Sequence, residues 1–423
     1  MARMNVLAEV AKGLKANIHA VDNLSPVARV AVCVKAGSRY EPDHLPGISH
    51  QIRASAGLTT YDSSVFGIAR HMERAGASFR VNSNREYIIY RVDCLRDKLD
   101  YVLGFIDDTI HRPEYRSWEL VDYIHPKLKH EISSYKHNQD ELINEAMHKA
   151  AFRGGLAHSV YTPEYRITKF NRNDLFEYLE KNFVLDRMTF TALGCDPEEF
   201  SSIIEEKFRL NGAEYKGVSG ESRYIGGGEA RVQAGFPLTK VNYVVQGVPI
   251  QDQKSLAALE VIASAFGTQK GAIHGDGSEK TLHNLMLSYS KSIRCSIINL
   301  SYQDHGLFGI SISGPNEKPF TTAVKAAIKQ TKQVLTNMNE NDLKRAKRIA
   351  RARCLIESEN HDIVFKAMAD RHAAGVTGQS PLALVESLTL KDVQAVAAQL
   401  LKSKPTMAVV GNPRFVPYVD ELD

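Results

Sequence analysis

Apolar residues follow two different spacings along this chain, and both spacings occur in each half. Segments 27–34 and 85–95 alternate or run apolar with β-branched and aromatic residues, which predicts β-strands. The spacing of amphipathic helices recurs over longer segments: 97–110, 118–135, 141–152, 174–183, 318–335 and 341–373. Asp196 followed by Pro197 predicts the start of another helix. Strand runs followed by helix runs predict an α+β fold, with helices packed on a mostly antiparallel sheet.

The same order of elements occurs twice, at an offset of about 220 residues. Segments 86–106 and 306–326 both combine a strand with a following helix, and segments 166–194 and 387–411 both end in a glycine after an apolar strand. Ala146-Met147 corresponds to Ala367-Met368 in the third matched pair. The repeat predicts two homologous domains, 1–212 and 230–423. Between them, 213–229 contains three consecutive glycines and is expected to be a flexible linker.

Composition places the chain among globular proteins of more than one domain. It has 423 residues, of which 43% are hydrophobic and 24% are charged, and its net charge of +4 gives no support for nucleic-acid binding. We find no apolar run of the roughly 20 residues that a bilayer-spanning helix requires. Five scattered cysteines without a C-x-x-C pair favour a reducing compartment. The first 15 residues resemble a transit peptide only weakly, because they contain Glu9 and no serine.

The chemistry-bearing motif nearest to a known pattern begins at His50. Inverted zinc-peptidase motifs read H-x-x-E-H, which places two histidine ligands and a general base on one helix. In this chain His50 occupies the first ligand position, but Arg53 replaces the glutamate and Ala54 replaces the second histidine. Arg53 also adds a positive charge where a divalent cation would bind, a repulsion on the order of 4 kcal/mol per unit charge at about 4 Å. We therefore predict no catalytic residue and no metal site here.

Other histidines do not compose a replacement site. His125, His130 and His137 lie on one predicted helix, but their spacings of five and seven residues do not form an i, i+4 pair. His71 is a single helical histidine, with Glu73 on a different face. We interpret these four residues as surface residues. No dinucleotide-binding, Walker or G-x-S-x-G motif occurs in the sequence.

A duplicated α+β chain with a degenerate inverted zinc motif resembles the pitrilysin-type metallopeptidases, the family of the mitochondrial processing peptidase. That family's third zinc ligand is a glutamate on a later helix, and its register falls on Glu131. The resemblance implies that His50 and Glu131 keep the family's residue types, whereas Arg53 and Ala54 do not. In the family's non-catalytic processing subunit, a glycine-rich loop helps to capture presequences. The corresponding stretch here, 267–277, has four glycines interrupted by polar residues, and we expect a mobile surface loop.

Within the family, the resemblance is strongest to the core subunits of mitochondrial ubiquinol–cytochrome c reductase, respiratory complex III. It is carried by four stretches: 24–42, 224–229, 301–310 and 413–422. The resemblance implies a non-catalytic scaffold on the matrix side of the mitochondrial inner membrane, peripheral to it and without a cofactor of its own. Implied partners are core protein 1, cytochrome b, cytochrome c1, the Rieske iron–sulfur protein and small subunits, within a dimeric complex. The alternative is a processing-peptidase subunit or a presequence-binding partner.

Overall fold

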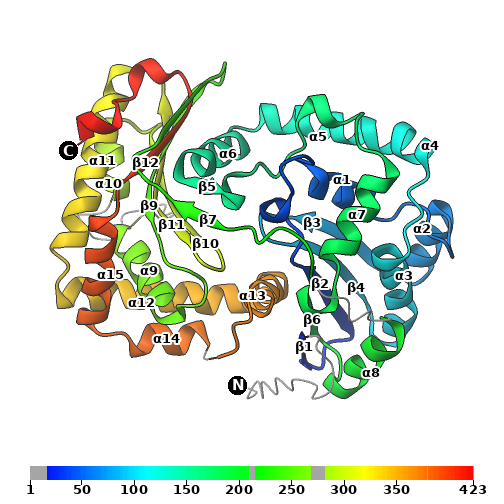
Figure 1. Ribbon diagram of the computed structural model, residues 1–423. Coiled ribbons are helices and arrows are strands. Elements are labelled where there is room, and N and C mark those ends of the chain that lie inside the picture. Colours follow the sequence, from blue (N-terminus) through cyan, green and yellow to red (C-terminus); the bar gives the residue numbers. More distant parts are fainter. Residues whose placement is uncertain (1–16, 209–214, 268–281, 379, 423) are drawn as a thin grey trace. The chain divides into compact units, whose positions relative to one another are not determined.

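In a computed structural model, the described strands form two five-stranded sheets and one two-stranded sheet (Figure 1). The structure describes residues 17–208, 215–267, 282–378 and 380–422. Contacts divide the chain into two compact units. As far as these ranges are described, unit 1 contains Met1–Ser134, Gly154–Glu221 and Asp362–Gly375, and unit 2 contains Tyr135–Arg153, Ser222–His361 and Val376–Asp423.

The sheet of unit 1 has the strand order β1-β6-β2-β4-β3. Its strands are β1 Asn17–Val21, β6 Met188–Leu193, β2 Val27–Val34, β4 Ile88–Leu95 and β3 Ser78–Ser83. The edge pair β1 and β6 is parallel, and the other neighbours are antiparallel. The strand predicted at 27–34 is confirmed with those bounds. Val30, Val32 and Val34 are buried on one face of the sheet, and Ala31 and Cys33 are buried on the other.

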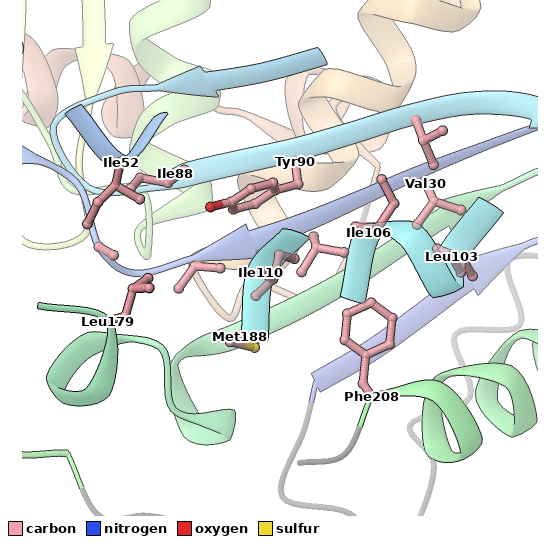
Figure 2. Close-up of a cluster of buried hydrophobic side chains, with 14 of the residues drawn as sticks. Val30, Ile52, Ile88, Tyr90, Leu103, Ile106, Ile110, Leu179, Met188 and Phe208 are labelled. Carbon is pink, nitrogen blue, oxygen red and sulfur yellow. The ribbon is translucent and has the colours of Figure 1, made fainter. Parts of the chain in front are cut away.

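Helices cover one face of this sheet and form the core of unit 1. The helices of the unit are α1 Ile48–Ser55, α2 Val65–Arg74, α3 Leu99–His111, α4 Ser117–Glu119, α5 His125–His137, α7 Arg172–Asn182 and α8 Pro197–Lys207. Val30 and Tyr90 of the sheet meet Leu103 and Ile106 of α3, with Phe208 beside them (Figure 2). Each of these side chains is 2% exposed or less, so their burial contributes to hydrophobic stabilisation on this face.

The sheet of unit 2 repeats the topology of the first. Its order is β8-β12-β9-β11-β10, formed by β8 Glu229–Gln233, β12 Thr406–Gly411, β9 Leu238–Gln246, β11 Gly306–Pro315 and β10 Arg294–Ser301. Again the edge pair, β8 and β12, is parallel and the rest is antiparallel. Its helices are α9 Gln253–Phe266, α10 Leu282–Tyr289, α11 Lys318–Thr336, α12 Glu340–Glu359, α14 Pro381–Ser387 and α15 Leu390–Lys402. The predicted duplicated α+β fold is confirmed.

Two helices are exchanged between the halves of the sequence. α13, His361–Ala373, packs in unit 1, where Phe365, Ala369 and Ala373 contact Ala31 and Cys33 on the sheet face opposite the main core. α6, Gln139–Ala151, packs in unit 2, where the Gln139 side-chain amide donates to the carbonyls of Leu238 at 2.8 Å and Val410 at 2.9 Å. The predicted domains 1–212 and 230–423 are continuous in sequence. They therefore assign α6 to the first domain and α13 to the second.

The helical pattern at 341–373 is divided into α12 and α13 by Asn360. Asn360 has an extended backbone, with φ −95° and ψ 105°, although neither Gly nor Pro occurs near it. Helical spacing alone therefore does not locate this break. It lies where the chain leaves the helices of unit 2 and enters unit 1.

The predicted linker 213–229 is partly regular structure, and its first two residues lie outside the described residues. Ser222–Tyr224 forms β7, which pairs with β5, Phe152–Gly154. Gly226 has a φ of +63°, and a Cβ added at Gly228 would stand 2.4 Å from the carbonyl oxygen of Ala150. Ser222–Tyr224 of the predicted linker is therefore a strand, and the flexibility of its other described residues stays a prediction. Gly226 and Gly228 fit a close backbone approach, whereas a Cβ added at Gly227 would meet no atom within 4 Å.

Acidic residues open equivalent helices in the two halves. Asn171 and Asp174 form a capping box at α7, and Thr389 and Asp392 form one at α15.

All five cysteines are free thiols. Among the described helices, none is both long and apolar enough to cross a membrane.

Candidate degenerate metal site

Helix α1 carries His50, Arg53 and Ala54, and it is fixed at its beginning by a remote cap. Gly47 precedes the helix with a φ of +87°, and a Cβ there would stand 2.5 Å from the Cα of Thr162. Because glycine has no side chain to cap the helix, the buried carboxylate of Glu41 accepts hydrogen bonds from the backbone N–H groups of Gly47 at 2.7 Å and Ser49 at 3.0 Å.

His50 is 1% exposed and has a partner at each ring nitrogen. The backbone N–H of Thr162 donates to Nδ1 at 3.0 Å, so the proton of the neutral ring lies on Nε2. Nε2 is 2.7 Å from Oε2 of Glu131 and donates to it. Burial lowers the pKa of His50 below its usual value, and the hydrogen bond to Glu131 opposes this only in part.

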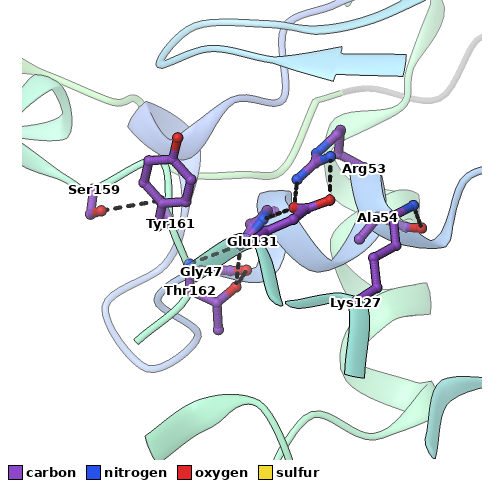
Figure 3. Close-up of polar contacts among 9 residues, drawn as sticks. Gly47, Arg53, Ala54, Lys127, Glu131, Ser159, Tyr161 and Thr162 are labelled. Atoms are coloured by element: carbon purple, nitrogen blue, oxygen red, sulfur yellow. Dashed lines mark hydrogen bonds and ion pairs between the residues drawn. The ribbon is translucent and has the colours of Figure 1, made fainter. Parts of the chain in front are cut away.

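Glu131 lies on α5, after the π-helical turn Leu120–Ile124, and Arg53 binds it with both arms of its guanidinium (Figure 3). Nη1 of Arg53 donates to Oε1 at 3.1 Å, and Nη2 donates to Oε2. Burial acts to raise the pKa of Glu131, but the hydrogen bonds from His50 and Arg53 outweigh it and lower that pKa to about 2. The carboxylate is therefore ionised and has a donor on each oxygen.

Ala54 provides no side-chain donor or acceptor, and its carbonyl oxygen accepts from Nζ of Lys127 at 2.8 Å. Zinc requires three or four ligands with free lone pairs. His50 uses one nitrogen lone pair on Thr162 and its Nε2 proton on Glu131, and Glu131 is occupied by Arg53. Among the described residues, no group of three or more His, Cys, Asp or Glu side chains is placed to hold a metal ion. The donor set does not fit zinc.

The sequence brought four positions together, and the structure places three of their side chains in one cluster: His50, Arg53 and Glu131. The structure adds Thr162 and Glu41, for which the sequence carried no signal. Thr162 is 112 residues from His50, and Glu41 caps a helix whose first residue is seven positions away.

The four other histidines considered in the sequence are not members of the cluster of His50, Arg53 and Glu131. His130 and His137 are exposed, and His125 is partly exposed. His71 contacts the hydroxyl of Tyr101 and stacks on Phe105 with ring centroids 5.0 Å apart. The stretch 267–277 lies outside the described residues except for Gly267.

Comparison with known families agrees with the fold. Residues 18–164 match the family model described as Insulinase (Peptidase family M16), and residues 169–350 match the model described as Peptidase M16 inactive domain. The chain belongs to the M16 peptidase family and consists of two M16-family domains.

The similar proteins include members of two groups. The chain is 29% identical over 411 residues to the human cytochrome b-c1 complex subunit 2, mitochondrial, covering 96% of this chain and 89% of that protein. The subunit 2 of Yarrowia lipolytica is 25% identical, covering 97% of this chain and 95% of the relative. The mitochondrial-processing peptidase subunit alpha of Solanum tuberosum is 26% identical, covering 98% and 83%. The resemblance to this family predicted from the sequence is confirmed.

Proposed function

We propose that this chain is a non-catalytic core subunit of mitochondrial ubiquinol–cytochrome c reductase, respiratory complex III, and that it acts as a scaffold for the complex. The observation that carries the proposal is the occupation of Glu131 by Arg53 and His50. Similarity to cytochrome b-c1 complex subunit 2 over nearly the whole chain supports the choice of complex.

The chemistry of α1 supports a role without catalysis. Peptide hydrolysis by this family's motif needs a carboxylate that takes a proton from a bound water. Arg53 occupies that position, and a guanidinium stays protonated and accepts no hydrogen bond. His50 is buried and already paired, so it does not replace the missing base.

The proposed partners are core protein 1, cytochrome b, cytochrome c1, the Rieske iron–sulfur protein and the small subunits of a dimeric complex. The proposed location is peripheral, on the matrix side of the mitochondrial inner membrane. None of the described helices is long and apolar enough to span a bilayer. This finding agrees with attachment through other subunits.

Purification of the native protein tests the proposal. We expect b- and c-type haem absorbance to co-purify with the chain, no stoichiometric zinc, and no cleavage of presequence peptides by the isolated chain. Stoichiometric zinc together with peptide cleavage would overturn the proposal. A control protein of the same preparation, such as a soluble matrix enzyme, should carry no haem absorbance.

The second candidate is a subunit of a processing peptidase or a presequence-binding partner. Similarity to the alpha subunit of the mitochondrial-processing peptidase favours it, at 26% identity over 427 residues. Saturable binding of a basic amphipathic presequence peptide by the isolated chain, without haem in the native preparation, would favour this second function over the first.

A further inference from the structure

The three charged or polar side chains at the former metal position form one closed cluster. His50, Arg53 and Glu131 have side chains that are only 1%, 18% and 24% exposed. An ionised carboxylate with this little access to water is stable only when a positive charge or several donors compensate it. In a zinc enzyme the metal supplies that charge.

The chain itself supplies the compensating charge. Both guanidinium arms of Arg53 bind Glu131, and the neutral His50 donates to the same carboxylate. Lys127 is the neighbouring cation on α5, but its ammonium group donates to the backbone carbonyl of Ala54. The carboxylate thus depends on Arg53 for a direct ion pair.

We propose that Arg53 is an internal cation that replaces the metal as the counter-charge of Glu131 and fastens α1 to α5, so that unit 1 folds without zinc. The role follows from side chains within unit 1 and does not depend on which complex the chain joins. Arg53 thereby has a structural role of its own, beyond the loss of catalysis.

An ordinary surface ion pair is the alternative, and it changes a folding equilibrium by about fivefold at most. The Arg53 pair differs in two respects. It is bidentate, and it shares its carboxylate with a buried histidine. Arg116 and Glu114 provide a matched exposed pair in the same unit, with a distance of 2.8 Å and side chains that are 43% and 27% exposed.

The first experiment compares Arg53→Ala with Arg116→Ala in the full chain by urea unfolding, with chelator present. We expect Arg53→Ala to lower the folding equilibrium constant by about tenfold or more, because it leaves Glu131 without its cation. Arg116→Ala should change it by less than about fivefold. Arg53→Lys should recover part of the loss, since lysine keeps the charge but lacks the two-armed hydrogen-bonding geometry of the guanidinium. An equal effect of Arg53→Ala and Arg116→Ala would refute the proposal.

The second experiment asks whether zinc and Arg53 compete for one position. The double variant R53A/A54H removes the cation and places a second histidine four residues after His50, on the same helix face. Ala54 is 2% exposed, so the shortened residue 53 must provide room for the imidazole. We expect zinc to raise the unfolding temperature of this variant and to bind once per chain in calorimetric titration. Wild type should show neither effect.

Glu131→Gln in the R53A/A54H background should abolish zinc binding, because the amide is a poor zinc ligand. Zinc binding by wild type with the affinity of R53A/A54H would overturn the proposal. So would a folded R53A/A54H protein, as judged by circular dichroism, that binds no zinc. If the double variant does not fold, the urea comparison of the single variants still decides the role of Arg53. None of these results depends on haem co-purification, so they separate this inference from the proposed function.

Discussion

The buried carboxylate of Glu41 should make the stability of this protein fall as pH rises, in contrast to the usual behaviour of a carboxylate. Its side chain is 3% exposed, and its hydrogen-bond donors are neutral: the N–H groups of Gly47 and Ser49 and the hydroxyl of Ser49. Burial raises the pKa of Glu41 from 4.5 to about 7, while these hydrogen bonds lower it only in part.

The sign and size of the effect follow from linkage. The folded protein holds the proton of Glu41 more tightly than the unfolded chain does, so this contribution is complete below pH 4.5 and is lost as pH rises through about 7. A difference of roughly 2.5 pKa units corresponds to about 3 kcal/mol. The carboxylate therefore opposes folding most strongly above pH 7.

Urea unfolding of wild type and Glu41→Gln between pH 4 and pH 8 measures this contribution. The amide stays neutral, so the stability of wild type relative to Glu41→Gln should fall by about 3 kcal/mol from the acidic to the alkaline end. Glu206→Gln is the control, because Glu206 has a side chain that is 72% exposed, and its curve should run parallel to wild type. A difference between wild type and Glu41→Gln that does not change with pH would refute the reasoning.

Three further substitutions test the fold. Phe365→Ala should destabilise the chain by about 3–5 kcal/mol in urea unfolding, because Phe365 is 1% exposed and anchors α13 on the sheet of unit 1; a loss below 1 kcal/mol would contradict that anchoring. Asn171→Ala should lower the free energy of unfolding by about 1 kcal/mol through loss of the α7 capping box, measured by thermal unfolding, and an unchanged midpoint would contradict it. Gly47→Ala should cost about 2 kcal/mol or more, since φ is +87° and the added Cβ would meet Thr162, and a stability equal to wild type would show that this turn adapts.

Much of the fold could be predicted from the sequence because its signals are local or repeated. The alternation in 27–34 gave β2, and the matched segments 86–106 and 306–326 gave β4 with α3 and β11 with α11. Since the two sheets have the same strand order, the internal repeat was a stronger guide than any single periodicity.

The exchange of α6 and α13 could not be predicted in this way. Helical spacing shows that one face of a helix is apolar, but it does not show which sheet that face covers. The corresponding segments Ala146-Met147 and Ala367-Met368 lie within these two helices. The repeat therefore shows that α6 and α13 are equivalent, but it does not show that each packs in the other unit. The break at Asn360 could not be predicted from helical spacing either, because neither glycine nor proline occurs near the end of α12.

The site was predicted in its residues but not in its interactions. Sequence reasoning considered Arg53 as a charge that would repel a metal, which describes only one half of its electrostatics. The other half is attraction to Glu131, a residue that remains after the second histidine and the general base are gone. If Glu131 had stayed without Arg53, it would be a poorly solvated carboxylate held by a neutral histidine alone, which is a destabilising arrangement. Arg53 stands where the family motif has its base and also compensates Glu131, so one residue both replaces that base and holds α1 on α5.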